Sequence, residues 1–322
     1  MQNVAKAAGT SPMTVSNCFR HPDRVQEKTR LTVLRVAAEL GYVPNMSAGL
    51  LAAGTSRVIG AVLPSVRNSA FYNYTVGMRR EATKRGFEVI TMIAETPEEE
   101  LSSVQTLLGL RVAGVALVAG PHAPELHHLM DRCGTPVVES WGGENAIGSG
   151  VGYNVGDASR DVTRHLIAQG RRRIGFVQIS GGGGLRYAHR LPAFQQEMFR
   201  AGLADDLVLT IRASDGFGAG AQIINDLVAR EPRLDAVLCP SDIVAAGAVF
   251  ECNRRGLSVP KEIAIAGWGD YDIGRQLTPT LTTIAPFADE IGISAVSALL
   301  NASDRDQSPI QTRYALYIRE SA

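Results

Sequence analysis

The chain has 322 residues, of which 45% are hydrophobic and 20% charged, and its 32 basic and 32 acidic side chains give no net charge. A chain of this length can form a small module together with one or two α/β domains. It contains no apolar run of membrane-spanning length and no secretion signal made of basic and then apolar residues. These observations argue against a membrane-spanning or secreted protein. We therefore expect a cytoplasmic protein without a membrane partner.

Charge is distributed unevenly along the chain. Residues 1–57 carry seven basic and three acidic side chains, whereas the remainder carries 25 basic and 29 acidic ones. A basic head on a slightly acidic body is typical of a module that neutralises nucleic-acid phosphates, joined to a domain that does not.

The four cysteines give no sign of a metal or a disulfide framework. Cys18, Cys133, Cys239 and Cys252 lie far apart, without metal-ligand spacing, in apolar surroundings. We therefore expect reduced core residues and no metal or other cofactor.

The first twenty residues predict two short helices joined by a tight turn. Val4 and Ala8 lie on one face of the first helix, and Gly9 supplies the backbone freedom that ends it. Ser11 is expected to cap a second helix that begins at Pro12, where a missing N–H costs nothing.

The second helix is expected to turn Val15, Cys18 and Phe19 inward. Its outward side chains then lie near a helix start that is small enough to enter the DNA major groove: Pro12, Met13, Thr14, Ser16 and Asn17. The alternative for this stretch alone is an ordinary amphipathic hairpin packed on a larger body.

A third helix is predicted from Gln26 to Leu40, ending at Gly41. Its expected core face is Leu31, Leu34, Val36, Ala37 and Leu40. Three helices in such a short stretch form one small bundle. The Ala-, Gly- and Ser-rich segment that follows is either a linker or a helix that forms only when something holds it, because it is too short to be stable alone.

From Arg57 onward, apolar strands alternate with amphipathic helices. The predicted strands are 58–63, 88–93, 114–118, 136–139, 150–153, 174–179, 208–211, 236–239 and 263–266. The predicted helices are 72–85, 97–109, 124–133, 157–169, 187–202, 219–230, 242–255 and 287–300. This alternation predicts parallel sheets covered on both faces, and its restart near residue 155 predicts two subdomains with a cleft between their strand ends.

Several blocks, in order and at matching spacing, resemble one family. They are VAKAAGTSPMTVS, the KTR to YVPN block at 28–45, IGAVLPSVRNSAFY, VAGVALV, GTPVVE and LTPTLTTI. The chain thereby resembles LacI/GalR-type bacterial transcriptional repressors over nearly its whole length, and most of all their gluconate repressor branch. The resemblance implies an all-α helix-turn-helix bundle (1–45), a hinge helix or linker (46–57), and an α/β periplasmic-binding-protein-like core of two doubly wound subdomains (58–322).

The resemblance also implies a homodimer that binds a pseudo-palindromic operator. Pro12, Met13 and Asn17 fall on base-contacting positions. Positions that contact phosphates are occupied by Thr14, Ser16, Lys28, Thr29 and Asn45. Leu51 occupies the position of the leucine that wedges into the minor groove. Asn17 replaces the family's usual basic residue and Gly49 its hinge arginine, so we expect a different base preference and a weaker hinge.

Family effectors bind between the subdomains. Arg190 occupies the position of the family's effector-binding arginine, and Arg186 lies one helical turn earlier. Gly269 stands where sugar-sensing members carry an aspartate, and the absence of a carboxylate beside two arginines favours a sugar acid such as gluconate. Branch similarity favours induction by the ligand.

Further candidates for effector contacts follow predicted strands or begin helices. They are Asn68, Phe71, Tyr72, Trp141, Phe217, Ser241, Asp242 and Trp268. The N–H groups at the helix start of Ser241 and Asp242 could hold an anion, and Trp268 could stack on a ligand. Each aromatic residue could equally serve plain packing.

An enzyme and a transport receptor are the two alternative functions. The Gly-rich stretches 148–156 and 181–184 lack the strand context and the acidic residue of a dinucleotide site, no GxSxG motif is present, and His127 and His128 suit a solvated face, so we expect no enzyme. A transport receptor that binds a sugar or sugar acid shares the two-subdomain core, but it would carry an export signal and no DNA-binding module.

Overall fold

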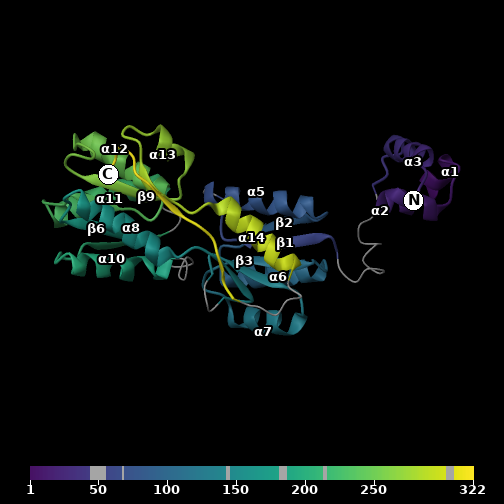
Figure 1. Cartoon of the computed structure of the whole chain (residues 1–322), viewed down its shortest axis with the longest axis horizontal. Coiled ribbons are helices and arrows are strands. Elements are labelled where there is room, and N and C mark those ends of the chain that lie inside the picture. Colours follow the sequence, from purple (N-terminus) through teal and green to yellow (C-terminus); the bar gives the residue numbers. More distant parts are fainter. Residues whose placement is uncertain (44–55, 67–68, 143–145, 181–186, 213–215, 302–307) are drawn as a thin grey trace. The chain divides into compact units, whose positions relative to one another are not determined.

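A computed structural model of the protein describes all residues except 44–55, 67–68, 143–145, 181–186, 213–215 and 302–307 (Figure 1). The chain divides into two compact units, Met1–Ser56 and Arg57–Ala322. Within the described part of the chain, none of the helices combines the length and apolarity needed to span a membrane.

The first unit is a bundle of α1 (Gln2–Ala7), α2 (Pro12–Arg20), the 3-10 turn η1 (Pro22–Arg24) and α3 (Glu27–Glu39). The predicted turn is confirmed: Gly9 has φ +62°, and the Ser11 hydroxyl accepts a hydrogen bond from the Thr14 N–H at 3.1 Å, with Pro12 in the first turn. The bundle core consists of Val4, Ala5, Val15, Cys18, Val33, Val36 and Ala37.

The predicted core face of α3 was partly wrong. Leu31 is 55% exposed and Leu40 is 52% exposed, whereas Val33 is fully buried. Because each helical residue adds 100° of rotation, Leu31 lies nearly opposite Val33, and Leu40 is the C-cap residue beyond the last helical turn. The prediction selected the leucines because their side chains are strongly apolar. The contacts with α1 and α2, however, decide which positions of α3 are buried.

Sheet A of the second unit has the strand order β11-β5-β4-β3-β1-β2, and its neighbouring strands are all parallel. Its strands are β1 (Val58–Leu63), β2 (Glu88–Ile93), β3 (Gly114–Val118), β4 (Val137–Ser140), β5 (Ser149–Gly152) and β11 (Ile310–Gln311). Its helices are α5 (Ser69–Lys84), α6 (Pro97–Gly109), α7 (Pro124–Cys133) and α14 (Ala288–Leu300).

Sheet B has the order β12-β10-β9-β8-β6-β7 and is parallel except for the β10–β12 pair. Its strands are β6 (Ile174–Ser180), β7 (Val208–Arg212), β8 (Ala236–Leu238), β9 (Ala264–Trp268), β10 (Thr282–Ala285) and β12 (Ala315–Tyr317). Its helices are α8 (Val155–Ala168), α10 (Arg190–Arg200), α11 (Gly216–Arg230), α12 (Asp242–Arg255) and α13 (Asp272–Gln276).

Helices cover both faces of each sheet because neighbouring strand residues point in opposite directions. Ile59 and Leu63 of β1 belong to the core cluster that includes α5 and α14, whereas Val62 belongs to the cluster that includes α6 and α7. In sheet B, α8 and α10 share one cluster, and α11 and α12 share another. The predicted doubly wound architecture is confirmed.

All nine predicted strands are present, with ends within two residues of the prediction. The prediction missed β10, β11, β12 and α13, which are two to five residues long. Three of the four cysteines are buried as expected, but Cys133 is exposed, because it lies on the outer side of the last turn of α7. His127 and His128 are exposed, as predicted.

The chain passes between the two sheets three times. The first crossover follows β5 at Tyr153, the second follows β10 at Phe287, and the third joins β11 to β12 through residues 312–314. Each time the chain leaves a sheet from the end of a parallel strand, so all three crossovers depart from a carboxyl edge.

Helices α5 and α14 pack closely although they lie about two hundred residues apart in the sequence (Figure 1). A Cβ atom at Gly77 would collide with the backbone carbonyl of Asp289, and one at Gly292 would collide with that of Tyr74. The two glycines therefore set the distance between these helices.

We expect Gly77→Ala to lower the free energy of unfolding by about 1–3 kcal/mol, because the added methyl group must push α14 away. Urea denaturation of the full chain measures this change. Gly109→Ala is the matched control: it lies in α6 with open space around it, and should be neutral or stabilising by up to about 1 kcal/mol. Equal effects of the two substitutions would contradict the packing argument.

Candidate DNA and effector sites

Helix α2 turns its predicted DNA-contacting residues away from the core. Pro12 and Met13 are exposed, Met13 by 70%, while Thr14, Ser16 and Asn17 are partly exposed. Val15 and Cys18 on the other face are buried, as expected. Phe19 is partly buried against the bundle core, so the predicted inward and outward faces of α2 are confirmed, while DNA contact by the outward face stays a prediction.

Two more predicted DNA-contacting residues lie at the start of α3. Lys28 is exposed and Thr29 is partly exposed in its first turn. Asn45, Gly49 and Leu51, with most of the predicted hinge, lie outside the described residues.

Arg190 begins α10 and is surrounded by aromatic rings. Its guanidinium carbon lies 3.6 Å from the ring centroid of Trp268 and 4.4 Å from that of Tyr187, and its Nη1 donates a hydrogen bond to the Pro240 carbonyl at 3.0 Å. The side chain is only 8% exposed. A guanidinium held flat against aromatic faces is preorganised for recognising a carboxylate.

Trp268 connects this group to the first crossover. Its indole N–H donates a hydrogen bond to the Tyr153 hydroxyl at 2.8 Å, and both side chains are buried. The structure thus brings together two predicted effector residues, Arg190 and Trp268, with Tyr153 and Tyr187, which the prediction did not include. No local sequence signal marked Tyr153, because its role depends on a strand of the other subdomain.

Phe71 and Trp141 form a second aromatic group, on sheet A. Their ring centroids lie 5.7 Å apart, and the buried Tyr74 ring lies 5.1 Å from Trp141. The Tyr74 and Ser140 hydroxyls are hydrogen-bonded at 2.7 Å. Phe71 is buried, whereas Tyr72, the next residue of α5, is 66% exposed and does not share this cluster.

Among the other predicted effector residues in the described part of the chain, Ser241 directly follows Pro240, whose carbonyl accepts the hydrogen bond from Arg190. Phe217 of α11 pairs with Phe250 of α12 at 6.2 Å. Asn68 and Arg186 lie outside the described residues. A hollow of about 640 Å³ runs along α8 and α10, and neither it nor a smaller one beside His122 is lined by a predicted effector residue.

Gly269 cannot be replaced by a larger residue without rearrangement. Its φ is +131°, and a Cβ atom there would collide with the Tyr271 ring. The local backbone conformation therefore favours glycine over aspartate at this position.

Four of the described non-glycine residues have a left-handed backbone conformation; Arg111 follows α6, and the other three lie one or two residues after a strand. Trp141 follows β4, Asp270 follows β9 and Phe287 follows β10, with φ of 58°, 50° and 45°. Such strained residues gather at functional sites, where the surrounding structure holds them in place. All three lie at carboxyl edges, where the sequence predicted the effector.

Asp242 serves the fold of sheet B. Ser241 caps α12, and the fully buried Asp242 carboxylate accepts hydrogen bonds from the Tyr271 N–H and the Thr283 hydroxyl, both at 2.6 Å. The carboxylate thereby joins α12, the α13 loop and β10, and its two oxygen atoms are both engaged.

Burial raises the pKa of Asp242 to about 7, although its hydrogen bonds to Thr283 and Tyr271 act in the opposite direction. The folded value exceeds the unfolded value of about 4, so this group's contribution to stability is complete below about pH 4 and is lost as the pH rises through 7.

Titration of Asp242 should lower the free energy of unfolding of the wild type by an amount on the order of a few kcal/mol as the pH rises from about 5 to about 8. Asp242→Asn has no group to titrate there, so we expect its free energy of unfolding to fall less over this range than that of the wild type. Urea denaturation across this range measures the difference. Asp272→Asn, at an exposed position on α13, should leave the wild-type profile unchanged. Parallel profiles for wild type and Asp242→Asn would contradict the assignment.

A buried ionic cluster lies at the carboxyl edge of sheet A. His122 Nδ1 lies 2.7 Å from a Glu100 oxygen, its Nε2 lies 3.5 Å from a Glu139 oxygen, and that Glu139 oxygen also accepts a hydrogen bond from the Ile147 N–H at 2.7 Å. Burial lowers the pKa of His122, but the two carboxylates outweigh it and raise the pKa to about 9. The imidazolium therefore holds Glu139 in place, and Glu139 in turn binds the backbone N–H of Ile147.

Known proteins match both units. Residues 1–45 match the model for bacterial regulatory proteins of the lacI family, and residues 163–322 match that for a periplasmic binding protein-like domain. The HTH-type transcriptional regulator GntR of Escherichia coli K12 is 32% identical over 93% of this chain and 90% of its own length. IdnR of the same organism is 28% identical over 98% and 96%.

A solved structure agrees with these relatives. A LacI-family transcriptional regulator from Silicibacter pomeroyi has a TM-score of 0.87 and 25% identity, covering 99% of this chain and 98% of that one. The helix-turn-helix bundle, the two α/β sheets and these relatives lead to one conclusion. The chain belongs to the LacI family of bacterial transcriptional regulators, and it is a DNA-binding repressor and not an enzyme.

Proposed function

We propose that this repressor acts in the cytoplasm as a homodimer and releases its operator when a sugar acid such as gluconate binds between the two subdomains. LacI-family repressors bind operator DNA and small-molecule effectors. The nature of the effector, the release of the operator on its binding, the dimeric state and the cytoplasmic location all belong to the proposal.

One observation carries the choice of a sugar acid: the buried Arg190 guanidinium lies between the Trp268 and Tyr187 rings. A carboxylate on the guanidinium and a carbon chain along the aromatic faces would satisfy both groups. Gly269 supports this choice, because it brings no carboxylate that would repel an acidic ligand, and a side chain at its φ of +131° would collide with the Tyr271 ring.

We expect D-gluconate to bind at least about tenfold more tightly than D-glucose, and Arg190→Lys to weaken gluconate binding by about tenfold or more, because lysine lacks the planar fork. Isothermal titration calorimetry on the full chain measures both affinities. Arg200→Lys is the control: Arg200 lies on the same helix, but its partner is Glu197. Tighter binding of glucose than of gluconate would refute the proposed effector class.

Operator recognition is assigned to the exposed side of α2 and the start of α3. Asn17 could pair bidentately with adenine, while Lys28 would contact phosphate. Two bundles of a dimer would then read two half-sites about one helical turn, or a multiple of it, apart.

We expect Asn17→Ala to weaken specific binding by roughly ten- to a hundredfold, because a bidentate base contact contributes about 1–3 kcal/mol. Lys28→Ala should weaken binding to all sequences. It should also reduce the slope of the logarithm of the binding constant against the logarithm of the salt concentration by about one. Fluorescence anisotropy at several salt concentrations, with DNA from beside the chain's own gene, measures both.

Arg35→Ala provides the control for loss of charge, since Arg35 is exposed on α3 at a position not assigned to DNA contact. If Asn17→Ala weakened random and specific DNA equally, α2 would not be the helix that reads bases.

A further inference from the structure

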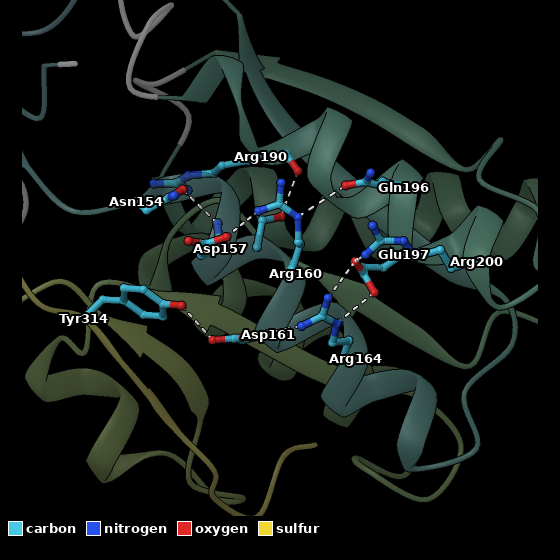
Figure 2. Close-up of polar contacts among 11 residues, drawn as sticks. Asn154, Asp157, Arg160, Asp161, Arg164, Arg190, Gln196, Glu197, Arg200 and Tyr314 are labelled. Carbon is cyan, nitrogen blue, oxygen red and sulfur yellow. Dashed lines mark hydrogen bonds and ion pairs between the residues drawn. The ribbon is translucent and has the colours of Figure 1, made fainter. Parts of the chain in front are cut away.

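Helix α8 is connected to the backbone of Arg190. The helix starts directly after the first crossover, where the Asn154 side chain caps it by accepting a hydrogen bond from the Asp157 N–H at 3.0 Å. The buried Ser159 hydroxyl of α8 donates a hydrogen bond to the Arg190 carbonyl at 2.8 Å. The residue proposed to hold the ligand is thus fastened directly to α8 (Figure 2).

Helices α8 and α10 are also joined to each other by side chains. Arg164 donates hydrogen bonds to both oxygens of Glu197, at 2.8 and 3.1 Å, and Arg160 donates one to Gln196 at 3.3 Å (Figure 2). The two helices also share one apolar cluster through Val162. A displacement of Arg190 therefore moves both helices together.

The other connection of α8 leads to the third crossover. The Tyr314 hydroxyl donates a hydrogen bond to Asp161 of α8 at 2.7 Å (Figure 2). Burial and the neighbouring Asp161 raise the pKa of Tyr314, so the hydroxyl stays protonated and remains a donor. Tyr314 lies in the short segment between β11 and β12, which belong to different sheets.

A second series of contacts connects Tyr314 to Arg190. The rings of Tyr314 and Tyr153 lie 5.8 Å apart, Tyr153 accepts the hydrogen bond from Trp268, and Trp268 stacks on Arg190. One path to the third crossover runs through α8, and the other runs through the first crossover. Both paths meet at Tyr314.

We propose that the hydrogen bond from Tyr314 to Asp161 is a positioning contact that couples a ligand at Arg190 to the crossovers between the subdomains. Short connecting segments absorb the backbone rotations of subdomain closure, and a ligand shifts the arrangement only through contacts that differ between the two states. The inference rests on the proposed function in taking Arg190 as the ligand-binding residue.

The test measures the ratio of operator dissociation constants with and without saturating D-gluconate. Tyr314→Phe removes the hydroxyl and keeps the ring, and should reduce this ratio by about fivefold or more, toward one. Gluconate affinity in the absence of DNA should change by less than about threefold, because Tyr314 makes no proposed ligand contact.

The control is Tyr317→Phe, on β12, because the Tyr317 hydroxyl makes no hydrogen bond to the described residues. It should leave the ratio unchanged. Asp161→Ala should reproduce the effect of Tyr314→Phe, the double variant should add nothing further, and Asp161→Asn, which keeps an acceptor, should retain most of the coupling. A wild-type ratio in both Tyr314→Phe and Asp161→Ala would overturn the proposal.

Hydrogen exchange without ligand separates this inference from the proposed effector. If gluconate leaves the operator dissociation constant of the wild type unchanged, gluconate is not the effector. The hydrogen exchange experiment alone then tests the contact between Tyr314 and Asp161. We expect Tyr314→Phe to accelerate exchange around residues 152–156 and 188–193, remote from the substitution. Acceleration confined to residues 312–316 would refute the coupling, and Asp161→Ala provides the same readout if Tyr314→Phe does not fold.

Discussion

The second unit depends on one constraint: a single chain connects the carboxyl edges of one parallel and one mostly parallel sheet three times. Parallel strands of one sheet all end at the same edge. The loops after β1, β3 and β4 therefore start at the carboxyl edge of sheet A, and those after β8, β9 and β10 start at the carboxyl edge of sheet B. The aromatic groups around Trp141 and Trp268, three of the left-handed residues, and the groups around His122 and Asp242 lie in these loops or next to them.

Local signals in the sequence predicted most of the fold. The cap at Ser11 and the turn at Gly9 depend on neighbouring residues only, and the long apolar strands bury both faces, so both were identified correctly. Short elements such as β11 and α13 have no pattern of their own and exist because neighbouring strands hold them. The burial of Val33 instead of Leu31 likewise depends on the positions of other helices.

The candidate site was less predictable, for a physical reason. Arg190 could be named from the family pattern and Trp268 from its place just after the end of a predicted strand, but Tyr153 and Tyr314 gain their roles from partners that lie far away in the sequence. The Glu100–His122–Glu139 cluster is of the same kind, since its members come from three different elements or loops. Asp242 illustrates the converse: its position at a helix start suggested an anion site, while its carboxylate holds the fold together.

The placement of α14, β11 and β12 at the far end of the sequence bears on how the protein is made. Sheet A needs α14 and β11, and sheet B needs β12, so neither subdomain is complete until residues 288–317 have been synthesised. The helix-turn-helix unit, built from contacts close in sequence, can fold long before, while the strands of the larger unit wait with apolar surface uncovered. Chaperone dependence during synthesis should therefore belong to the effector-binding part of the molecule and not to its DNA-reading part.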